Sequence, residues 1–250
     1  MQNSCTGIIP ARFASSRFPG KPLVEIHGKT MIQRVYEQAS KCGRLKQVIV
    51  ATDDERIFDE ISRFGGHVVM TSGHHQSGTD RCAEVAKHLA LQSDDVIINI
   101  QGDEPFIDPV QISHLCECFD NPQVNLATLV KSFYSASEIP DPNSIKVVCD
   151  KNGYALYFSR LPIPFQRDEN EGAFKLENFV RHIGIYGYRA GTLAELAALQ
   201  PSFLETSEKL EQLRWLENGY KIMTARSEHE SWSIDTPEDL EKVKQHFGKP

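Results

Sequence analysis

The chain has 250 residues, of which 40% are hydrophobic and 24% carry a charge. This composition is ordinary for a globular protein, and it excludes collagen-like repeats, coiled coils and intrinsic disorder. The 27 basic and 34 acidic residues give a net charge of −7, and such a surface repels polyanions. We therefore expect no nucleic-acid or anionic-membrane surface, and an anionic ligand requires a local basic cluster.

Membrane and disulfide architectures are also disfavoured. No run approaches the ~20 apolar residues of a membrane span, and the first residues have neither the basic nor the apolar region of a signal peptide. The six cysteines include no CxxC motif. Their closest pair, Cys116 and Cys118, has a spacing at which helical side chains point apart. These features predict reduced thiols and a soluble, cytoplasmic protein with no membrane insertion.

In the first hundred residues, short β-branched runs alternate with helical patterns, which is typical of a mostly parallel sheet covered by helices. Thr30 and Gln33 form a capping-box pattern before the first helix. A second helix ends at Gly65-Gly66, and a third is predicted at 81–91. Strands are predicted at 6–10, 47–52, 68–71 and 96–100, and the last of these is apolar enough to be buried on both faces.

Beyond residue 140 the pattern changes. Asn152-Gly153 is a strong hairpin signal between strands predicted at 145–149 and 154–159. After these come a polar loop at 166–178, a strand at 179–188 and a helix at 207–216, and Thr236 caps a last helix. We predict one α/β domain over 1–250, built on an open, mostly parallel sheet flanked by helices, with an inserted β-hairpin region.

A cluster of cations follows the first predicted strand. Arg12, Arg17 and Lys21 lie within ten residues, together with the hydroxyls of Ser15 and Ser16. Open α/β sheets bind ligands at the carboxyl ends of their strands, and cations with loop amides suit a polyphosphate. The alternative is a solvated turn that carries ordinary surface cations.

This loop is not a Walker A motif. Serine stands at position 15, where the first glycine belongs, and proline follows Lys21. No GxGxxG follows a predicted strand, which argues against a dinucleotide-binding dehydrogenase.

Two acids stand at comparable places in the predicted fold. Asp103 comes just after the buried strand at 96–100, and Asp235 precedes the last helix. One or two carboxylates plus phosphate oxygens are sufficient for a magnesium ion, so the pair forms a candidate metal site if the fold brings them together. Taken alone, Asp103 is also a typical turn or cap residue. The small polar residues at 76–81 suit either a base and ribose or a helix N-terminus.

Several motifs resemble those of one enzyme family. The run IIPARFASSRFPGKPL resembles the nucleotide-binding loop of the 3-deoxy-manno-octulosonate cytidylyltransferases, also called CMP-Kdo synthetases. The later motifs resemble that family's in the same order, from about residue 6 to residue 243: VIVATDDERI, HQSGTDR, NIQGDEP, GYALYFSRLPIP, RHIGIYGYRAG, LEQLRW and IDTPEDLE. Many sugar nucleotidyltransferases share the first loop, whereas the combination is specific.

The resemblance implies a nucleotidyltransferase fold, a homodimer and magnesium as cofactor. The implied reaction joins CTP to the eight-carbon sugar acid Kdo and yields CMP-Kdo, for lipopolysaccharide biosynthesis, and pyrophosphate. Residues 145–200 would bind the sugar and contact a second subunit. Two departures are a shorter polar loop after Pro164, and Ser233-Ile234 where Gly-Val is more usual before Asp235.

The resemblance also implies roles for individual residues. The residues implied for CTP are Ala11, Arg12, Ser16, Arg17, Lys21, Ser77, Gly78, Thr79 and Gln101. Those implied for the sugar are Gln101, Arg160, His182, Tyr188, Glu211 and Gln212. Asp103 and Asp235 would bind magnesium, and both acids would act in catalysis with Arg12 and Lys21.

Some of these roles have competing interpretations. The planar guanidinium of Arg160 suits the sugar carboxylate. His182 and Tyr188 have equal parity and would share a face of their strand, but periodicity alone makes Tyr188 a core residue. Two other functions remain open: an enzyme that activates a different acidic sugar, and a catalytically silent nucleotide-binding or scaffold protein.

Overall fold

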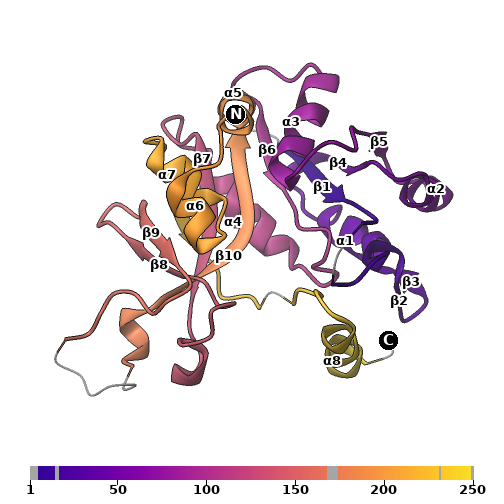
Figure 1. Ribbon diagram of the computed structural model, residues 1–250. Helices are drawn as coiled ribbons and strands as arrows, with labels where there is room; N and C mark the ends of the chain where they lie inside the picture. Colours follow the sequence, from indigo (N-terminus) through magenta and orange to yellow (C-terminus); the bar gives the residue numbers. More distant parts are fainter. Residues whose placement is uncertain (1–4, 15–16, 168–173, 231, 249–250) are drawn as a thin grey trace.

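The computed structural model describes residues 5–14, 17–167, 174–230 and 232–248. Its main sheet is open and has the strand order β11-β7-β10-β6-β1-β4-β5 (Figure 1). The first four strands of this sheet along the chain are β1 (Cys5–Ala11), β4 (Leu45–Thr52), β5 (Val68–Met70) and β6 (Val96–Asn99). They pair in parallel, so this half of the sheet agrees with the prediction.

The other half of the sheet is mixed. Its strands are β7 (Leu126–Ser132), β8 (Lys146–Cys149), β9 (Ala155–Ser159), β10 (Val180–Arg189) and β11 (Met223–Arg226). β10 runs antiparallel between β6 and β7, whereas β11 is parallel to β7. The segment 145–200 contains the β8–β9 hairpin, which projects from the main sheet, and β10, which is a central strand of that sheet (Figure 1). Both strands of the predicted hairpin are confirmed.

Helices cover both faces of the sheet, because residues in its strands alternate between the two sides. Ile9 of β1 packs in one core with α1 (Met31–Ala39), α2 (Glu55–Arg63) and α4 (Pro109–Cys118). Its neighbour Ile8 packs in the other core with α3 (Gly78–His88), α5 (Ala190–Ala197) and α7 (Gln212–Glu217). β6 lies between the two cores and is buried throughout, as its composition predicted. The open sheet flanked by helices is therefore confirmed.

Local capping explains several helix boundaries. Thr30 accepts a hydrogen bond from the backbone N–H of Gln33, as predicted, whereas the side chain of Gln33 turns to Glu37. α3 begins at Gly78 behind a Ser77–Asp80 capping box, three residues earlier than we predicted.

The prediction of a single helix at 207–216 is wrong. The structure has α6 (Phe203–Glu208) and α7 instead, because Lys209 adopts a left-handed conformation with φ of 55° and ends α6. Sequence patterns also missed α4, α5, β7 and β11, together with two short strands before α1.

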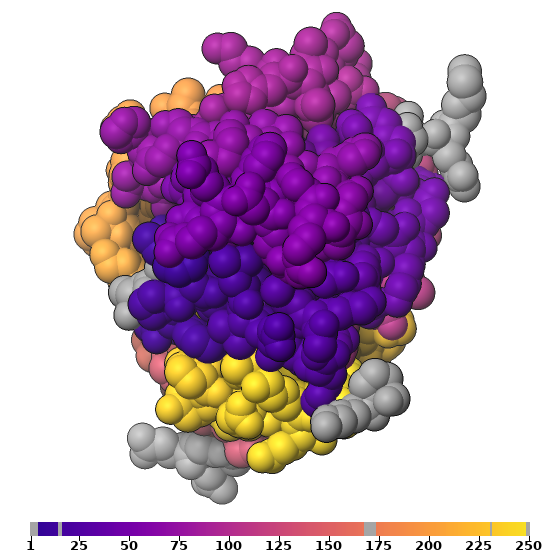
Figure 2. All heavy atoms as spheres, turned by 90° about the vertical axis from the view of Figure 1, so that its right-hand side faces the viewer, coloured from indigo at the N-terminus to yellow at the C-terminus, as the bar shows by residue number. Residues whose placement is uncertain are grey.

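The last helix, α8 (Pro237–Phe247), closes the fold over its N-terminal part. Thr236 caps α8 as predicted. Leu240 and Val243 pack with Met31 and with Ile26 of the small β2 (Glu25–Ile26) and β3 (Lys29–Thr30) ribbon. Figure 2 shows the C-terminal atoms, in yellow, against the indigo N-terminal segment. This packing brings the end of the chain beside the loop that follows β1.

Among the residues that the structure describes, no helix combines the length and the apolar character needed to cross a membrane. Part of the polar loop predicted at 166–178 lies outside the described residues.

Candidate active site

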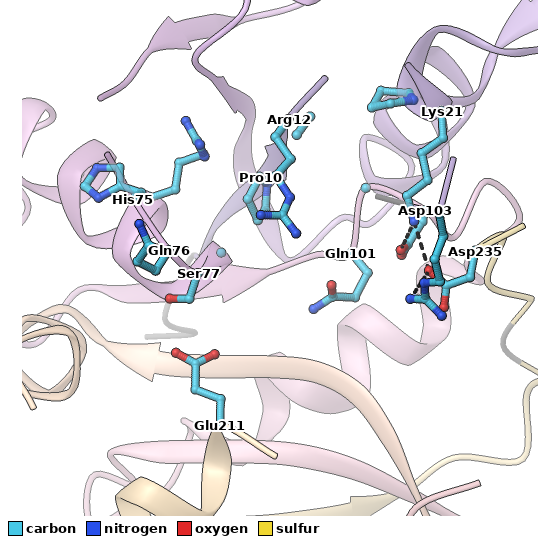
Figure 3. Close-up of a pocket in the computed structure, with 16 residues that line it drawn as sticks. Pro10, Arg12, Lys21, His75, Gln76, Ser77, Gln101, Asp103, Glu211 and Asp235 are labelled. Carbon is cyan, nitrogen blue, oxygen red and sulfur yellow. Dashed lines mark hydrogen bonds and ion pairs between the residues drawn. The ribbon is translucent and has the colours of Figure 1, made fainter. Parts of the chain in front are cut away.

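A cavity of about 410 Å³ opens at the carboxyl ends of β1 and β6 (Figure 3). It collects residues from the loop after β1, the start of α3, the loop after β6, the segment before α7 and the segment before α8. Ten of its lining residues were singled out from the sequence: Ala11, Arg12, Arg17, Lys21, Ser77, Gly78, Gln101, Asp103, Glu211 and Asp235. Ser15 and Ser16 lie outside the described residues.

Lys21 holds the two predicted acids together. Its Nζ lies 2.7 Å from Asp103 Oδ2 and 3.1 Å from Asp235 Oδ1, and it also donates to the carbonyl of Ile234 at 3.1 Å. Arg17 lies 3.0 Å from the same oxygen of Asp235. Two carboxylates that are distant in sequence thus converge on one cation, as the candidate metal site requires.

The backbone fixes this arrangement. The N–H of Ile234 donates to the carbonyl of Asp103 at 2.9 Å, which ties the two acid-bearing segments together. Gly102 passes so close to β1 that an added Cβ would lie 2.8 Å from the carbonyl oxygen of Pro10. Gly20 has φ of 72°, a left-handed conformation that glycine adopts without a steric penalty, and it turns the chain into Lys21.

The N-terminus of α3 forms another wall of the cavity. Ser77 caps the helix, so the structural interpretation of this motif is correct, and Ser77 also lines the cavity. Arg81, one turn further, is buried and lies 3.0 Å from Asp53 Oδ2. Thr79 is buried too, and it donates to Glu211 Oε2 at 3.2 Å rather than lining the cavity.

Glu211 faces this wall from the opposite side, and its carboxylate points into the cavity (Figure 3). Burial raises the pKa of this carboxyl, because a low dielectric disfavours the charged form. The site therefore combines an ion-paired end around Lys21 with a buried carboxyl, that of Glu211, on its other side.

A second cavity of about 330 Å³ shares Gln101 and Asp103 with the first. Two residues that the resemblance implies for the sugar, His182 and Gln212, line it. Gln101 Nε2 donates to the carbonyl of Gly184 at 2.7 Å, which holds this side chain in the wall between the two cavities. Burial lowers the pKa of His182 to about 3, so its ring is neutral at pH 7.

Arg160 lies away from both cavities. Its guanidinium donates to three backbone carbonyls: Nε to Glu208 at 2.6 Å, Nη1 to Pro142 at 2.9 Å and Nη2 to Lys209 at 3.2 Å. In this arrangement Arg160 closes the fold between β9 and α6.

Tyr188 lies in the core rather than in either cavity. Its ring centroid lies 5.8 Å from that of Trp215 and 6.2 Å from that of Tyr186, which lies 5.4 Å from His182. His182 and Tyr188 therefore share a face as their parity predicted, but Tyr188 is too deep along β10 to reach the second cavity.

Sequence patterns missed two cations that line the second cavity. Lys131 of β7 and Arg181 of β10 are direct cross-strand neighbours. Arg181 begins the motif RHIGIYGYRAG but was given no role of its own, and the proximity of the two cations depends on a strand pairing that we did not predict. His75 and Arg81 of the first cavity lie in the motif HQSGTDR, but only its small residues were given a role from the sequence.

Within the described parts of the chain, no group of three or more His, Cys, Asp and Glu side chains is arranged to hold a metal ion. Asp103 and Asp235 remain as a two-carboxylate pair around Lys21.

Comparisons with known proteins agree on one family. Residues 6–222 match the family model described as Cytidylyltransferase. The chain is 54% identical to a 3-deoxy-manno-octulosonate cytidylyltransferase of Phocaeicola vulgatus, over 95% of this chain and 94% of the relative. It is 48% identical to the enzyme of the same name from Geobacter sulfurreducens, over 95% and 97% of the two chains.

Solved structures agree with this result. The fold matches a CMP:2-keto-3-deoxy-manno-octonic acid synthetase complexed with CTP, with a TM-score of 0.89, 42% identity and 98% coverage of both chains. A 4-diphosphocytidyl-2C-methyl-D-erythritol synthase from Anaerococcus prevotii has a TM-score of 0.63 at 12% identity over 99% of both chains, which shows a shared fold alone.

Proposed function

Because this chain belongs to the 3-deoxy-manno-octulosonate cytidylyltransferase family, we propose that it transfers CMP from CTP to Kdo. The products are CMP-Kdo, for lipopolysaccharide biosynthesis, and pyrophosphate. The observation that carries this proposal is the meeting of Lys21, Asp103 and Asp235 in one cavity that shares Gln101 with a second. Two adjoining cavities suit a nucleotide and an acceptor that react at their common wall.

The first cavity suits CTP. Arg12, Arg17 and Lys21 place three cations there in a protein whose net charge is −7, so a triphosphate finds its favourable interactions at this site. The first backbone N–H groups of α3 add a dipole that favours anions. Ser77 and Gly78 lie at the same helix end, where the base and ribose have small polar neighbours.

The two acids fit a magnesium ion. Their oxygens already converge on one cation, Lys21 Nζ, and two carboxylates with phosphate oxygens and waters are a usual magnesium environment. Asp103 and Asp235 would hold the ion, which when bound would neutralise phosphate charge and lower the pKa of a coordinated hydroxyl. With the ion on the two acids, Lys21 and Arg17 would contact the phosphates instead.

The reaction requires little covalent chemistry from the protein. The anomeric hydroxyl oxygen of Kdo attacks the α-phosphorus, and the bond to the bridging oxygen of pyrophosphate breaks. Catalysis of such transfers depends mainly on positioning and charge stabilisation. Arg12 and Lys21 would offset the developing negative charge, and Gln101 would position the acceptor. The neutral His182 and the amide of Gln212 provide polar groups for the sugar hydroxyls.

We also propose that the enzyme is a homodimer that works in the cytoplasm. Support for the dimer comes from four large apolar side chains that are exposed in and next to the segment 145–200, since exposed apolar surface often marks subunit contacts. These residues are Leu156, Leu161, Phe165 and Phe203. Support for the cytoplasm comes from six cysteines that are all thiols, which persist in reducing compartments. Sedimentation velocity on the purified chain tests the dimer, and a single monomeric species would contradict it.

The reaction is tested by measuring pyrophosphate release with CTP, magnesium and Kdo. Parallel reactions replace CTP by ATP, UTP or GTP, and Kdo by an amino-substituted Kdo or by sialic acid. We expect release with CTP and Kdo alone. Release with another sugar acid but not with Kdo would retain the chemistry and reject the acceptor. CTP binding with no release from any acceptor would support a nucleotide-binding protein without activity.

A further inference from the structure

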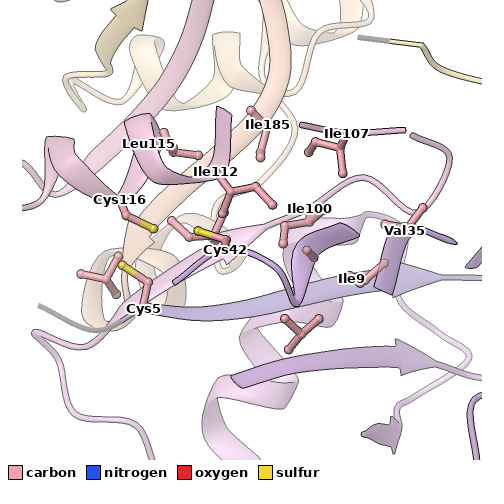
Figure 4. Packing of buried hydrophobic residues seen from close by; sticks show 14 of the residues in the cluster. Cys5, Ile9, Val35, Cys42, Ile100, Ile107, Ile112, Leu115, Cys116 and Ile185 are labelled. Carbon is pink, nitrogen blue, oxygen red and sulfur yellow. The ribbon is translucent and has the colours of Figure 1, made fainter. Parts of the chain in front are cut away.

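Three buried cysteines meet at the end of the sheet opposite the candidate active site. Cys5 begins β1, Cys42 lies in the turn between α1 and β4, and Cys116 lies in α4. Their exposed fractions are 0%, 3% and 0%. Figure 4 shows the three sulfur atoms pointing toward one another from these separate elements. The proposed reaction uses none of them.

The thiols in this cluster are not equivalent. The side chain of Cys116 interacts with those of both Cys42 and Cys5. Cys42 Sγ also lies 3.3 Å from the hydroxyl oxygen of Ser113, and backbone groups of Arg44 and Leu45 add to the interactions that lower its pKa. Groups that donate to one sulfur stabilise its thiolate form, so the cluster favours negative charge on Cys42 and a proton on Cys116.

The pKa values follow the same division. The hydrogen bond from Cys116 is the main cause that lowers the pKa of Cys42, to about 6. The hydrogen bonds to Cys42 and Cys5, together with burial, raise the pKa of the Cys116 thiol far above its ordinary range. Cys42 therefore has the character of the attacking thiolate, and Cys116 that of the protonated partner.

Cys42 also has the best route to a small reagent. It lies in a turn whose neighbours Ser40, Lys41 and Gly43 are exposed, so a small opening of this turn uncovers its sulfur. Cys5, by contrast, lies within a strand paired on both sides. Cys82, in the other core, shows that burial alone does not make a thiol reactive: burial raises the pKa of the Cys82 thiol, which disfavours the thiolate.

We propose that Cys42 and Cys116 form an oxidation site, at which a small two-electron oxidant converts the two thiols into a disulfide. With a diazene dicarboxamide such as diamide, the Cys42 thiolate adds to one nitrogen of the N=N bond. The sulfur of Cys116 then attacks the sulfur of Cys42 and forms the S–S bond. The S–N bond breaks, the diamide leaves as its hydrazine, and the two thiol protons end on the two nitrogens.

The cross-link would join the end of α1 to α4, and both helices cover the same face of the sheet. Cys5 is the first residue of β1, whereas Ala11, which lines the cavity, is the last. The disulfide therefore lies a full strand away from the proposed nucleotide site. We expect the oxidised protein to unfold at a higher temperature and to retain its CMP-transfer activity.

The test is oxidation of the folded, full-length protein with diamide, followed by thiol counting after unfolding and by mass mapping of the cross-linked peptides. We expect the six thiols to fall to four, with the Cys42 peptide joined to the Cys116 peptide. Cys42→Ser and Cys116→Ser should each abolish this loss, whereas Cys82→Ser should lose two thiols like the wild type.

Two results would overturn the proposal. One is six thiols remaining in the folded wild type under conditions that oxidise the urea-unfolded chain. The other is a disulfide that maps to Cys5 or to any other pair. Cys116→Ser changes a buried helical residue and could fail to fold. In that case the Cys42→Ser variant, which changes a turn residue, and the wild-type peptide map still decide the question.

Discussion

The parallel and mixed halves of the sheet hold their charged side chains in different ways. Beside the parallel half, Lys21 is paired with Asp103 and Asp235 in an open cavity. In the mixed half, two cations instead bind backbone carbonyls: Lys146 donates to Asp141 at 3.0 Å, and Arg189 donates to Val124 at 3.1 Å. Both of these cations are buried.

This difference separates groups that can exchange partners from groups that cannot. A phosphate or a metal ion can replace one member of an ion pair in a cavity. A buried backbone carbonyl cannot exchange its cation for a ligand in this way, and leaving it unpaired costs free energy. Substitutions in the ion pairs of the cavity should therefore reduce activity, and substitutions of buried cations that bind backbone carbonyls should reduce stability.

The largest effect is expected at the two acids. Asp103→Asn and Asp235→Asn should each lower kcat for CMP transfer at least ~100-fold at saturating magnesium, the size of losing one electrostatic contact to a transition state. The melting temperature should change little, because the substitutions are isosteric and the cavity is open to water.

Asp120→Asn is the matched control, since Asp120 pairs with Arg44 at the far end of the sheet. Pyrophosphate release over a magnesium titration measures these effects. Near wild-type turnover in either acid variant would remove that residue from the mechanism.

Arg160→Met tests the mixed half. The variant loses three hydrogen bonds to backbone carbonyls, so we expect the free energy of unfolding to fall by about 2 kcal/mol. That loss corresponds to a melting temperature roughly 4–8 °C lower in a chain of this size. The KM for CTP should be unchanged, and Arg63→Met, at an exposed helical position, should leave stability nearly unaltered.

The same variant also tests whether Arg160 is a structural residue or a sugar-binding one. A large rise in the KM for Kdo, with an unchanged melting temperature, would show that Arg160 leaves the carbonyls to bind the sugar carboxylate. Equal rises in the KM values for Kdo and CTP would exclude that role.

His182 gives a smaller, pH-dependent effect. Its pKa is about 3 in the folded chain, against 6.5 as the ordinary value, so between these values the unfolded chain binds a proton that the folded chain does not. The free energy of unfolding should therefore fall as the pH drops from 6.5 toward 3, by at most about 1.4 kcal/mol per pH unit from this residue.

Urea unfolding of the wild type and of His182→Gln at pH 7 and pH 5 isolates this contribution. The wild type should lose more stability than the variant. Equal losses would mean that His182 is accessible to protons in the folded state.

The smallest effect is expected at the cap of α8. Thr236 Oγ1 accepts from the N–H of Asp239, and loss of an N-cap costs about 1 kcal/mol. Thr236→Ala should lower stability by that amount and raise the KM for CTP slightly, because α8 follows Asp235 directly. Thr236→Ser keeps the capping hydroxyl, so its stability and its KM for CTP should match the wild type. If Thr236→Ser has the same defect as Thr236→Ala, loss of the cap is not the cause.

Much of the parallel half could be predicted from the sequence. Its strands are buried β-branched runs, and the loop with Arg12, Arg17 and Lys21 follows the first of them. Because parallel strands end at the same edge, residues that follow them must lie close together. β7 and β11 were missed although β7 is as long as β1, because their pairing is non-local and lies outside the regular alternation of strands and helices. Lys209 ends α6 by a left-handed conformation, for which a lysine gives no sequence signal.

The sequence by itself determined which chemical groups follow each strand, where Thr30 and Thr236 begin helices, and that the cations of an acidic chain gather after β1. Only the tertiary structure decided which of these groups meet. Lys21 contacts Asp235 across 214 positions of the chain, and Arg160 reaches the carbonyls of α6 instead of a cavity. Local patterns follow from the dihedral preferences and polarity of neighbouring residues, whereas the partner of a charge depends on how distant segments pack.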